Sequence, residues 1–177
     1  MYWFRKQVLM CTASHCMQKG ANQVAGRLRM ELKRKGLDHE VLANTCDSIE
    51  ICDLGPNLVV YPEGTIYRNV QMKDIPKIIR SLQEGGEPVE HLILTPDSED
   101  EVNRRKLFEE ATVEDAIPTN DFMALVEKYG LDQEWVDEQA RRGFIAHKER
   151  DGQPIITVTS KARDRYGIPL AGQATEE

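Results

Sequence analysis

The 177-residue sequence lacks any long apolar run. A membrane-spanning helix needs about 20 consecutive apolar residues, and no stretch approaches that length. The apolar start of the chain is interrupted by Arg5 and Lys6, and no small-residue cleavage site follows it, so no secretion signal is predicted. We therefore expect a soluble, cytoplasmic protein without a membrane partner.

Cysteine is scarce and confined to the start of the chain, at Cys11, Cys16, Cys46 and Cys52. The Cys-x-x-Cys spacing of redox-active disulfides is absent. The cytosol keeps thiols reduced, so clustered cysteines in a cytosolic chain more often bind metal than form structural disulfides. A metal centre that bridges two loops is therefore predicted.

The spacing of the cysteines leaves more than one kind of centre open. Four residues separate the first pair, five separate the second pair, and 29 lie between the pairs. Four thiolates around two irons form the usual [2Fe-2S] centre. Structural zinc sites usually place two to four residues between paired ligands, so they fit less well. Zinc, thiol-disulfide chemistry and four unliganded cysteines remain alternatives, and we interpret His15 as a loop residue near the site.

Hydrophobic periodicity in the first half predicts an α/β fold. Gln7–Met10 resembles a strand, apolar residues at helical spacing follow from Ala21 to Leu32, and His39–Asn44 resembles a second strand. A hairpin is expected over residues 58–68 and a second helix over residues 73–83. This order predicts a mixed, thioredoxin-like sheet flanked by two helices.

The second half of the chain is more acidic and carries no cysteine. Residues 1–96 have a net charge of +1, whereas residues 97–177 have a net charge of −8. We expect a first domain over residues 1–94, an acidic linker over 95–101 and a second domain over 102–177.

The second domain is expected to be mostly helical, with a closing hairpin. Helices are predicted over 102–109, 120–129 and 132–142, then a hairpin over 144–158 and a helix over 160–166. This order is similar to a small winged helix. The helix that would read DNA carries Asp132, Glu134, Asp137 and Glu138 against two arginines, so nucleic-acid binding is not expected.

Three segments carry a resemblance to a known family. They are Val8–Cys11, Cys16–Ala21 and, above all, Cys52–Gly64, and residues 85–90 fit the same pattern. Across residues 7–94 the chain resembles the thioredoxin-like [2Fe-2S] ferredoxins. It is more distantly similar to the thioredoxin-fold iron-sulfur subunit of respiratory complex I.

The resemblance implies a one-electron carrier rather than an enzyme, often working as a homodimer and serving an unidentified redox partner enzyme. It also implies that Cys11, Cys16, Cys46 and Cys52 are the ligands of a [2Fe-2S] cluster. The family usually has three residues between the last two ligands, a spacing that would place Ser48 at the third position. We expect Cys46 to be the ligand, because a thiol lies only two residues away. An iron-sulfur redox-sensing regulator and a zinc-stabilised interaction module are the alternative functions.

Charged residues around the second cysteine pair predict a low reduction potential. Asp47, Glu50 and Asp53 would oppose the addition of an electron to a nearby cluster. The same carboxylates would present an acidic rim to a basic partner. Solvated loop charges without either role are the simpler interpretation.

Overall fold

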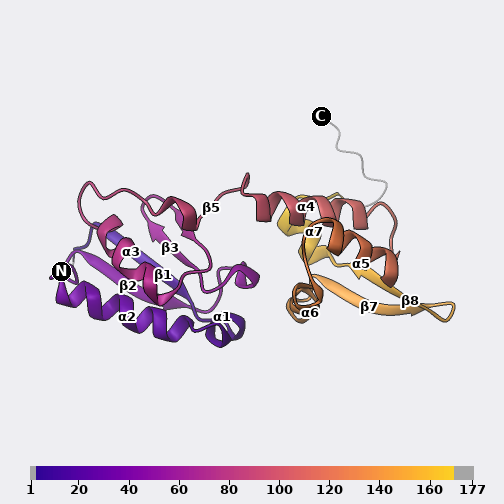
Figure 1. Cartoon of the computed structure of the whole chain (residues 1–177), viewed down its shortest axis with the longest axis horizontal. Coiled ribbons are helices and arrows are strands. Elements are labelled where there is room, and N and C mark those ends of the chain that lie inside the picture. Colours follow the sequence, from indigo (N-terminus) through magenta and orange to yellow (C-terminus); the bar gives the residue numbers. More distant parts are fainter. Residues whose placement is uncertain (1–2, 170–177) are drawn as a thin grey trace. The chain divides into compact units, whose positions relative to one another are not determined.

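A five-stranded mixed sheet organises the first part of the chain (Figure 1). The computed structural model describes residues 3–169, and the chain divides into two compact units, Met1–Thr95 and Pro96–Glu177. The elements of the first unit are β1 (Lys6–Cys11), α1 (Ser14–Gln18), α2 (Ala21–Arg34), β2 (Val41–Cys46), η1 (Cys52–Leu54), β3 (Leu58–Tyr61), β4 (Thr65–Tyr67), η2 (Met72–Asp74), α3 (Ile75–Ser81), η3 (Glu90–Leu92) and β5 (Ile93–Leu94).

The strand order of this sheet is β2-β1-β3-β4-β5. Strands β1 and β2 are parallel and joined through α2, whereas the other neighbouring pairs are antiparallel. This arrangement confirms the predicted mixed, thioredoxin-like sheet. Cys11 lies opposite Cys46 in the register of the parallel pair. The loops that follow β1 and β2 therefore leave the sheet at the same edge.

The core of the first unit lies between the sheet and helices α2 and α3. Val8 and Met10 of β1 pack there with Leu28 of α2 and Ile78 of α3. Side chains alternate between the two faces of a strand, so these contacts place both helices on the same face of the sheet. Helices α2 and α3 also contact each other, as expected for two helices on one face.

The second unit is mostly helical and closes with a β-hairpin. Its elements are α4 (Glu99–Ala111), β6 (Ile117–Pro118), α5 (Thr119–Lys128), α6 (Gln133–Arg142), β7 (Ile145–Arg150), β8 (Gln153–Val158) and α7 (Ser160–Tyr166). The three strands form a separate sheet in the order β6-β8-β7. Phe108, Phe122, Trp135 and Phe144 belong to a core of their own, distinct from that of the first unit.

Two local predictions need correction. His15 is not a loop residue, because Ser14–Gln18 forms α1, which also places Cys16 on a helix. The linker predicted over residues 95–101 is shorter, because α4 begins at Glu99. Three acidic residues occupy the first turn of α4, where negative charge interacts favourably with the amino end of the helix dipole.

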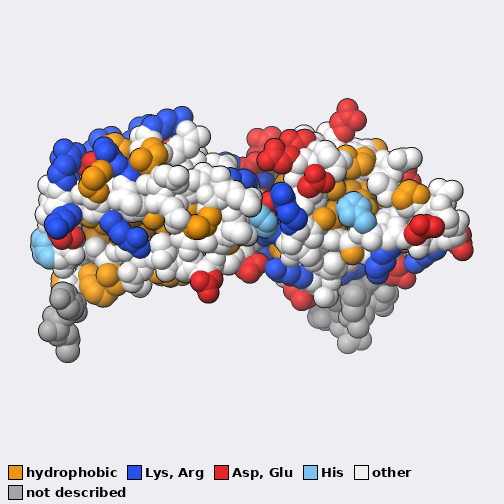
Figure 2. All heavy atoms as spheres, turned by 90° about the horizontal axis from the view of Figure 1, so that it is seen from below, with side chains coloured by type: hydrophobic (Ala, Val, Ile, Leu, Met, Phe, Trp, Pro, Cys, Tyr) orange, Lys and Arg blue, Asp and Glu red, His pale blue; other side chains and the backbone are white. Residues whose placement is uncertain are grey.

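The two units differ in surface charge. Figure 2 shows one face of the molecule, on which lysine and arginine predominate over the first unit and acidic side chains are more frequent over the second. Within residues 3–169, no helix is both long enough and apolar enough to cross a membrane.

Candidate metal centre

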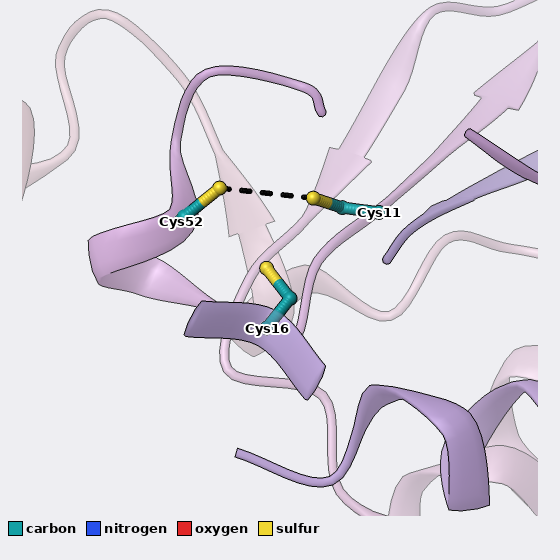
Figure 3. A group of neighbouring side chains, drawn as sticks. All are labelled: Cys11, Cys16 and Cys52. Atoms are coloured by element: carbon teal, nitrogen blue, oxygen red, sulfur yellow. Dashed lines mark hydrogen bonds between the residues drawn. The ribbon is translucent and has the colours of Figure 1, made fainter. Parts of the chain in front are cut away.

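Three cysteine side chains meet at the edge of the first sheet (Figure 3). The sulfur atoms of Cys11, Cys16 and Cys52 all lie within 4.8 Å of one another, and all three residues are buried. The Sγ atoms of Cys11 and Cys52 are 3.7 Å apart. Soft thiolate sulfur is the donor type that zinc and iron-sulfur clusters prefer. The residues present therefore fit a metal centre.

Each of the three cysteines comes from a different element. Cys11 is the last residue of β1, Cys16 lies in the short helix α1, and Cys52 opens the 3-10 turn η1. A main-chain hydrogen bond, in which Thr12 N donates to the carbonyl oxygen of Cys46, ties the segment after β1 to the end of β2. The thiols are thus gathered by the ends of regular elements rather than by one continuous motif.

Gly55 lies directly against the Cys16 side chain. A Cβ atom built on this glycine would lie 2.5 Å from Cys16 Sγ and 2.9 Å from the carbonyl oxygen of Cys52. The φ angle of Gly55 is −74°, which any residue can adopt. Glycine is needed here for its lack of a side chain, not for its backbone freedom.

The three thiols interact strongly enough to change one another's acidity. Hydrogen bonds from Cys16 and Cys52 lower the pKa of Cys11 to about 2. The hydrogen bond with Cys11 raises the pKa of Cys16, with further contributions from Cys52 and from burial. The pKa of Cys52 is raised chiefly by its hydrogen bond with Cys11. One thiolate is favoured and the others are opposed, so full ionisation of the group requires a compensating cation.

The fourth predicted ligand, Cys46, lies outside this group. It is half-buried at the end of β2, and its Sγ atom lies 3.7 Å from the carbonyl oxygen of Met10. Burial raises the pKa of Cys46, and the nearby charges of Cys11, Asp47 and Cys52 raise it further. The Cys46 side chain is therefore close enough to interact electrostatically with the other thiols, although it is not part of their group.

Ser48 lies beside one of the three thiols, that of Cys52. Its hydroxyl oxygen is 3.6 Å from Cys52 Sγ and accepts a hydrogen bond from the main-chain N–H of Glu50 at 3.0 Å. Glu50 itself has a φ angle of 64°, which gives the loop between Cys46 and Cys52 a sharp turn. The loop between Cys46 and Cys52 thus places the Ser48 hydroxyl beside Cys52.

Charged groups surround the second cysteine segment. Asp47 and Glu50 are exposed, and Asp53 is partly exposed. A positive charge is also present, because Lys19 Nζ donates to the main-chain oxygen of Asp53 at 2.8 Å. The site therefore combines acidic side chains with one lysine that the sequence interpretation did not include.

Comparison with curated proteins adds an independent observation. The chain is 38% identical over 77 residues to a 2Fe-2S ferredoxin of Clostridium pasteurianum, an alignment that covers 44% of this chain and 76% of that protein. It is also 30% identical over 84 residues to a 2Fe-2S ferredoxin of Aquifex aeolicus, covering 45% of this chain and 73% of that protein. This chain belongs to the 2Fe-2S ferredoxin family. The resemblance stated from the sequence is thereby confirmed.

Solved structures include a similar protein. The crystal structure of the thioredoxin-like [2Fe-2S] ferredoxin from Aquifex aeolicus matches with a TM-score of 0.49 and 27% sequence identity. That match covers 52% of this chain and 98% of the other. No protein-family model matches the chain.

The structure of this ferredoxin family member reveals a polar residue that the sequence analysis did not single out. Asn57 is fully buried between the cysteine segments. The sequence shows only an asparagine directly before an apolar strand, and its burial, which makes a hydrogen-bonding role expected, is known from the structure.

Proposed function

We propose that this protein is a one-electron carrier that holds a [2Fe-2S] cluster through Cys11, Cys16, Cys46 and Cys52. The observation that carries the proposal is the group of three buried thiols within 4.8 Å of one another. The curated relatives are named as 2Fe-2S ferredoxins, which supports this cluster over a lone zinc ion. When bound, such a cluster supplies one-electron oxidation and reduction, and the protein supplies ligands, burial and orientation.

The residues of this chain have separate tasks in the proposal. Cys11, Cys16 and Cys52 present sulfur donors that are already together and shielded from water. Cys46 turns its side chain from Met10 toward them, from a position in register with Cys11. No acid-base residue is required, because the transferred species is an electron.

The proposal extends to the setting in which the protein acts. The first unit is the ferredoxin domain, and the winged-helix-like second unit, Pro96–Glu177, serves as a docking or dimer-packing module. The protein works in the cytoplasm, as a homodimer, with a redox enzyme as its partner. Exposed Asp47 and Glu50 support docking of a basic partner surface beside the cluster.

Metal analysis of protein purified without oxygen tests the proposal. We expect two irons and two acid-labile sulfides per chain, a reddish-brown colour, and an electron paramagnetic resonance signal that appears on one-electron reduction. Colourless protein with one zinc and no sulfide would instead identify an interaction module. Reversible reduction by one electron separates a carrier from a thiol-disulfide protein, whose reduction takes two electrons.

A further inference from the structure

Asn57 contacts all three segments that carry the buried thiols. Its main-chain oxygen accepts the N–H of Cys11 at 3.1 Å. Its side-chain Nδ2 donates to the carbonyl oxygen of Ile51, the residue before Cys52, at 2.8 Å. The same nitrogen lies 3.9 Å from Cys16 Sγ, within hydrogen-bonding range for sulfur. One residue thus connects the ends of β1, α1 and η1.

The nitrogen and the oxygen of the Asn57 side-chain amide differ in their hydrogen bonding. Its side chain is 0% exposed, and Oδ1 has no hydrogen-bond partner in the described part of the chain, residues 3–169. A buried acceptor without a partner is costly, and leucine would fill nearly the same space without that cost. The advantage of asparagine at this position must therefore come from its two N–H groups. One of them reaches a carbonyl oxygen and the other points to a sulfur.

We infer that Asn57 is a positioning residue of the [2Fe-2S] site, which fixes the Cys52 segment through Ile51 and donates a hydrogen bond to the thiolate of Cys16. The inference rests on the proposed function. A hydrogen bond to a ligand sulfur withdraws negative charge from it, so a cluster accepts an electron more readily. Asn57 therefore raises the reduction potential that the nearby carboxylates lower.

Replacing Asn57 with leucine removes both N–H donors while keeping a side chain of similar size. We expect the equilibrium constant for reduction of the loaded protein, measured against mediators, to fall about tenfold, which equals about 59 mV for a one-electron couple. The matched control is Asn22→Leu, an exposed position in α2, which should leave the potential unchanged. If N57L unfolds at a lower temperature but keeps the wild-type reduction potential, the inferred hydrogen bond from Asn57 to Cys16 is wrong.

A second measurement needs no variant and covers the case in which N57L does not retain the cluster. Wild-type protein labelled with 15N only at asparagine is reduced by one electron and studied by pulsed electron paramagnetic resonance. A hyperfine coupling from an asparagine side-chain nitrogen supports the inference, and the absence of such a coupling overturns it. Wild-type protein without iron and sulfide would refute the proposed function itself, whereas iron-loaded protein with no asparagine coupling refutes only the role of Asn57.

Discussion

At the scale of single residues, Cys46 and Ser48 compete for the place beside the three buried thiols. Ser48 is 3.6 Å from Cys52 Sγ, whereas Cys46 lies against Met10. Ligand chemistry favours Cys46 over Ser48, because a thiol ionises far more easily than a hydroxyl and is the softer donor. The ligand is decided by which cost is smaller: turning the Cys46 side chain or deprotonating the Ser48 hydroxyl.

Alanine substitutions separate these two residues. We expect Cys46→Ala to lose most of its iron and sulfide, because only three thiolates remain. Ser48→Ala should retain both in wild-type amounts. Iron and sulfide analysis, together with the visible absorption spectrum, measures the outcome. If Ser48→Ala lost the cluster and Cys46→Ala kept it, the assignment of Cys46 as a ligand would be wrong.

Gly55 and Gly26 provide a matched pair of glycine substitutions. In Gly55→Ala the new methyl group would overlap Cys16 Sγ and the Cys52 carbonyl, so we expect a loss of about 1–3 kcal/mol in the free energy of unfolding. Nothing lies within 4 Å of a Cβ at Gly26, which occupies an exposed helical position in α2. Gly26→Ala should therefore stabilise the protein by about 0.5–1 kcal/mol.

Denaturant unfolding of both variants measures this difference, and cluster content provides a second readout. Only Gly55→Ala should lower the amount of bound iron, because only that methyl group displaces a ligand. Equal effects of the two substitutions on stability and iron would show that Gly55 does not shape the site.

The grouping of Cys11, Cys16 and Cys52 could be predicted from the sequence, but the positions of Cys46 and Ser48 around that group could not. Cysteine is rare in this chain, and its position after two apolar runs was enough to indicate a shared site. The positions of Cys46 against Met10 and of Ser48 beside Cys52 leave no comparable signal, because they depend on the conformation of the loop between them, which includes a φ angle of 64° at Glu50. Asn57 was missed for a similar reason, because its partners Cys11, Cys16 and Ile51 come from three separate segments.

At the scale of elements, predictions were most accurate where a helix has clear end signals. Helix α7 spans Ser160–Tyr166 as expected, and α6 follows Asp132 and ends before Gly143, whose φ angle is 72°. The short helix α1 and the two-residue strand β6 were missed, because neither is long enough to show a hydrophobic period. Tertiary contacts, rather than local propensity, establish these short elements.

The amino end of α6 gives a prediction at this scale. The side chain of Asp132 accepts the main-chain N–H of Trp135 at 2.9 Å, which satisfies one of the free donors of the first turn. We expect Asp132→Ala to lower the free energy of unfolding of the second unit by about 1 kcal/mol. Asp137→Ala, at an exposed position within the same helix, should change it by less than about 0.5 kcal/mol.

Tryptophan fluorescence is a suitable probe for this measurement. Trp135 is 7% exposed and Trp3 is 75% exposed, so the change in emission on unfolding comes mainly from Trp135 in α6. An equal loss of stability in both variants would contradict the capping role of Asp132.

At the scale of the whole molecule, the two units differ in net charge. Residues 97–177 have a net charge of −8, and the exposed acidic positions of α6 include Glu134 and Asp137. Phosphate contacts supply most of the affinity of a protein for DNA, so an acidic reading helix opposes binding. We expect no retention of the full chain on duplex DNA at about 0.1 M salt, where the Debye length is about 10 Å. Retention that falls as the salt concentration increases would instead favour the alternative function, an iron-sulfur redox-sensing regulator that binds DNA.

The two units also have separate hydrophobic cores, one around Leu28 and Ile78 and the other around Phe108 and Phe144. A unit with its own core can fold alone, and all four cysteines belong to the first unit. We therefore expect residues 1–95 and residues 96–177, produced separately, each to unfold cooperatively at the denaturant concentration seen for that unit in the full chain. The first fragment should carry all of the iron and have the reduction potential of the intact protein, while the second binds none. A first fragment that loses its cluster would instead mean that the acidic unit completes the site, and mixing the two fragments should then restore the iron content.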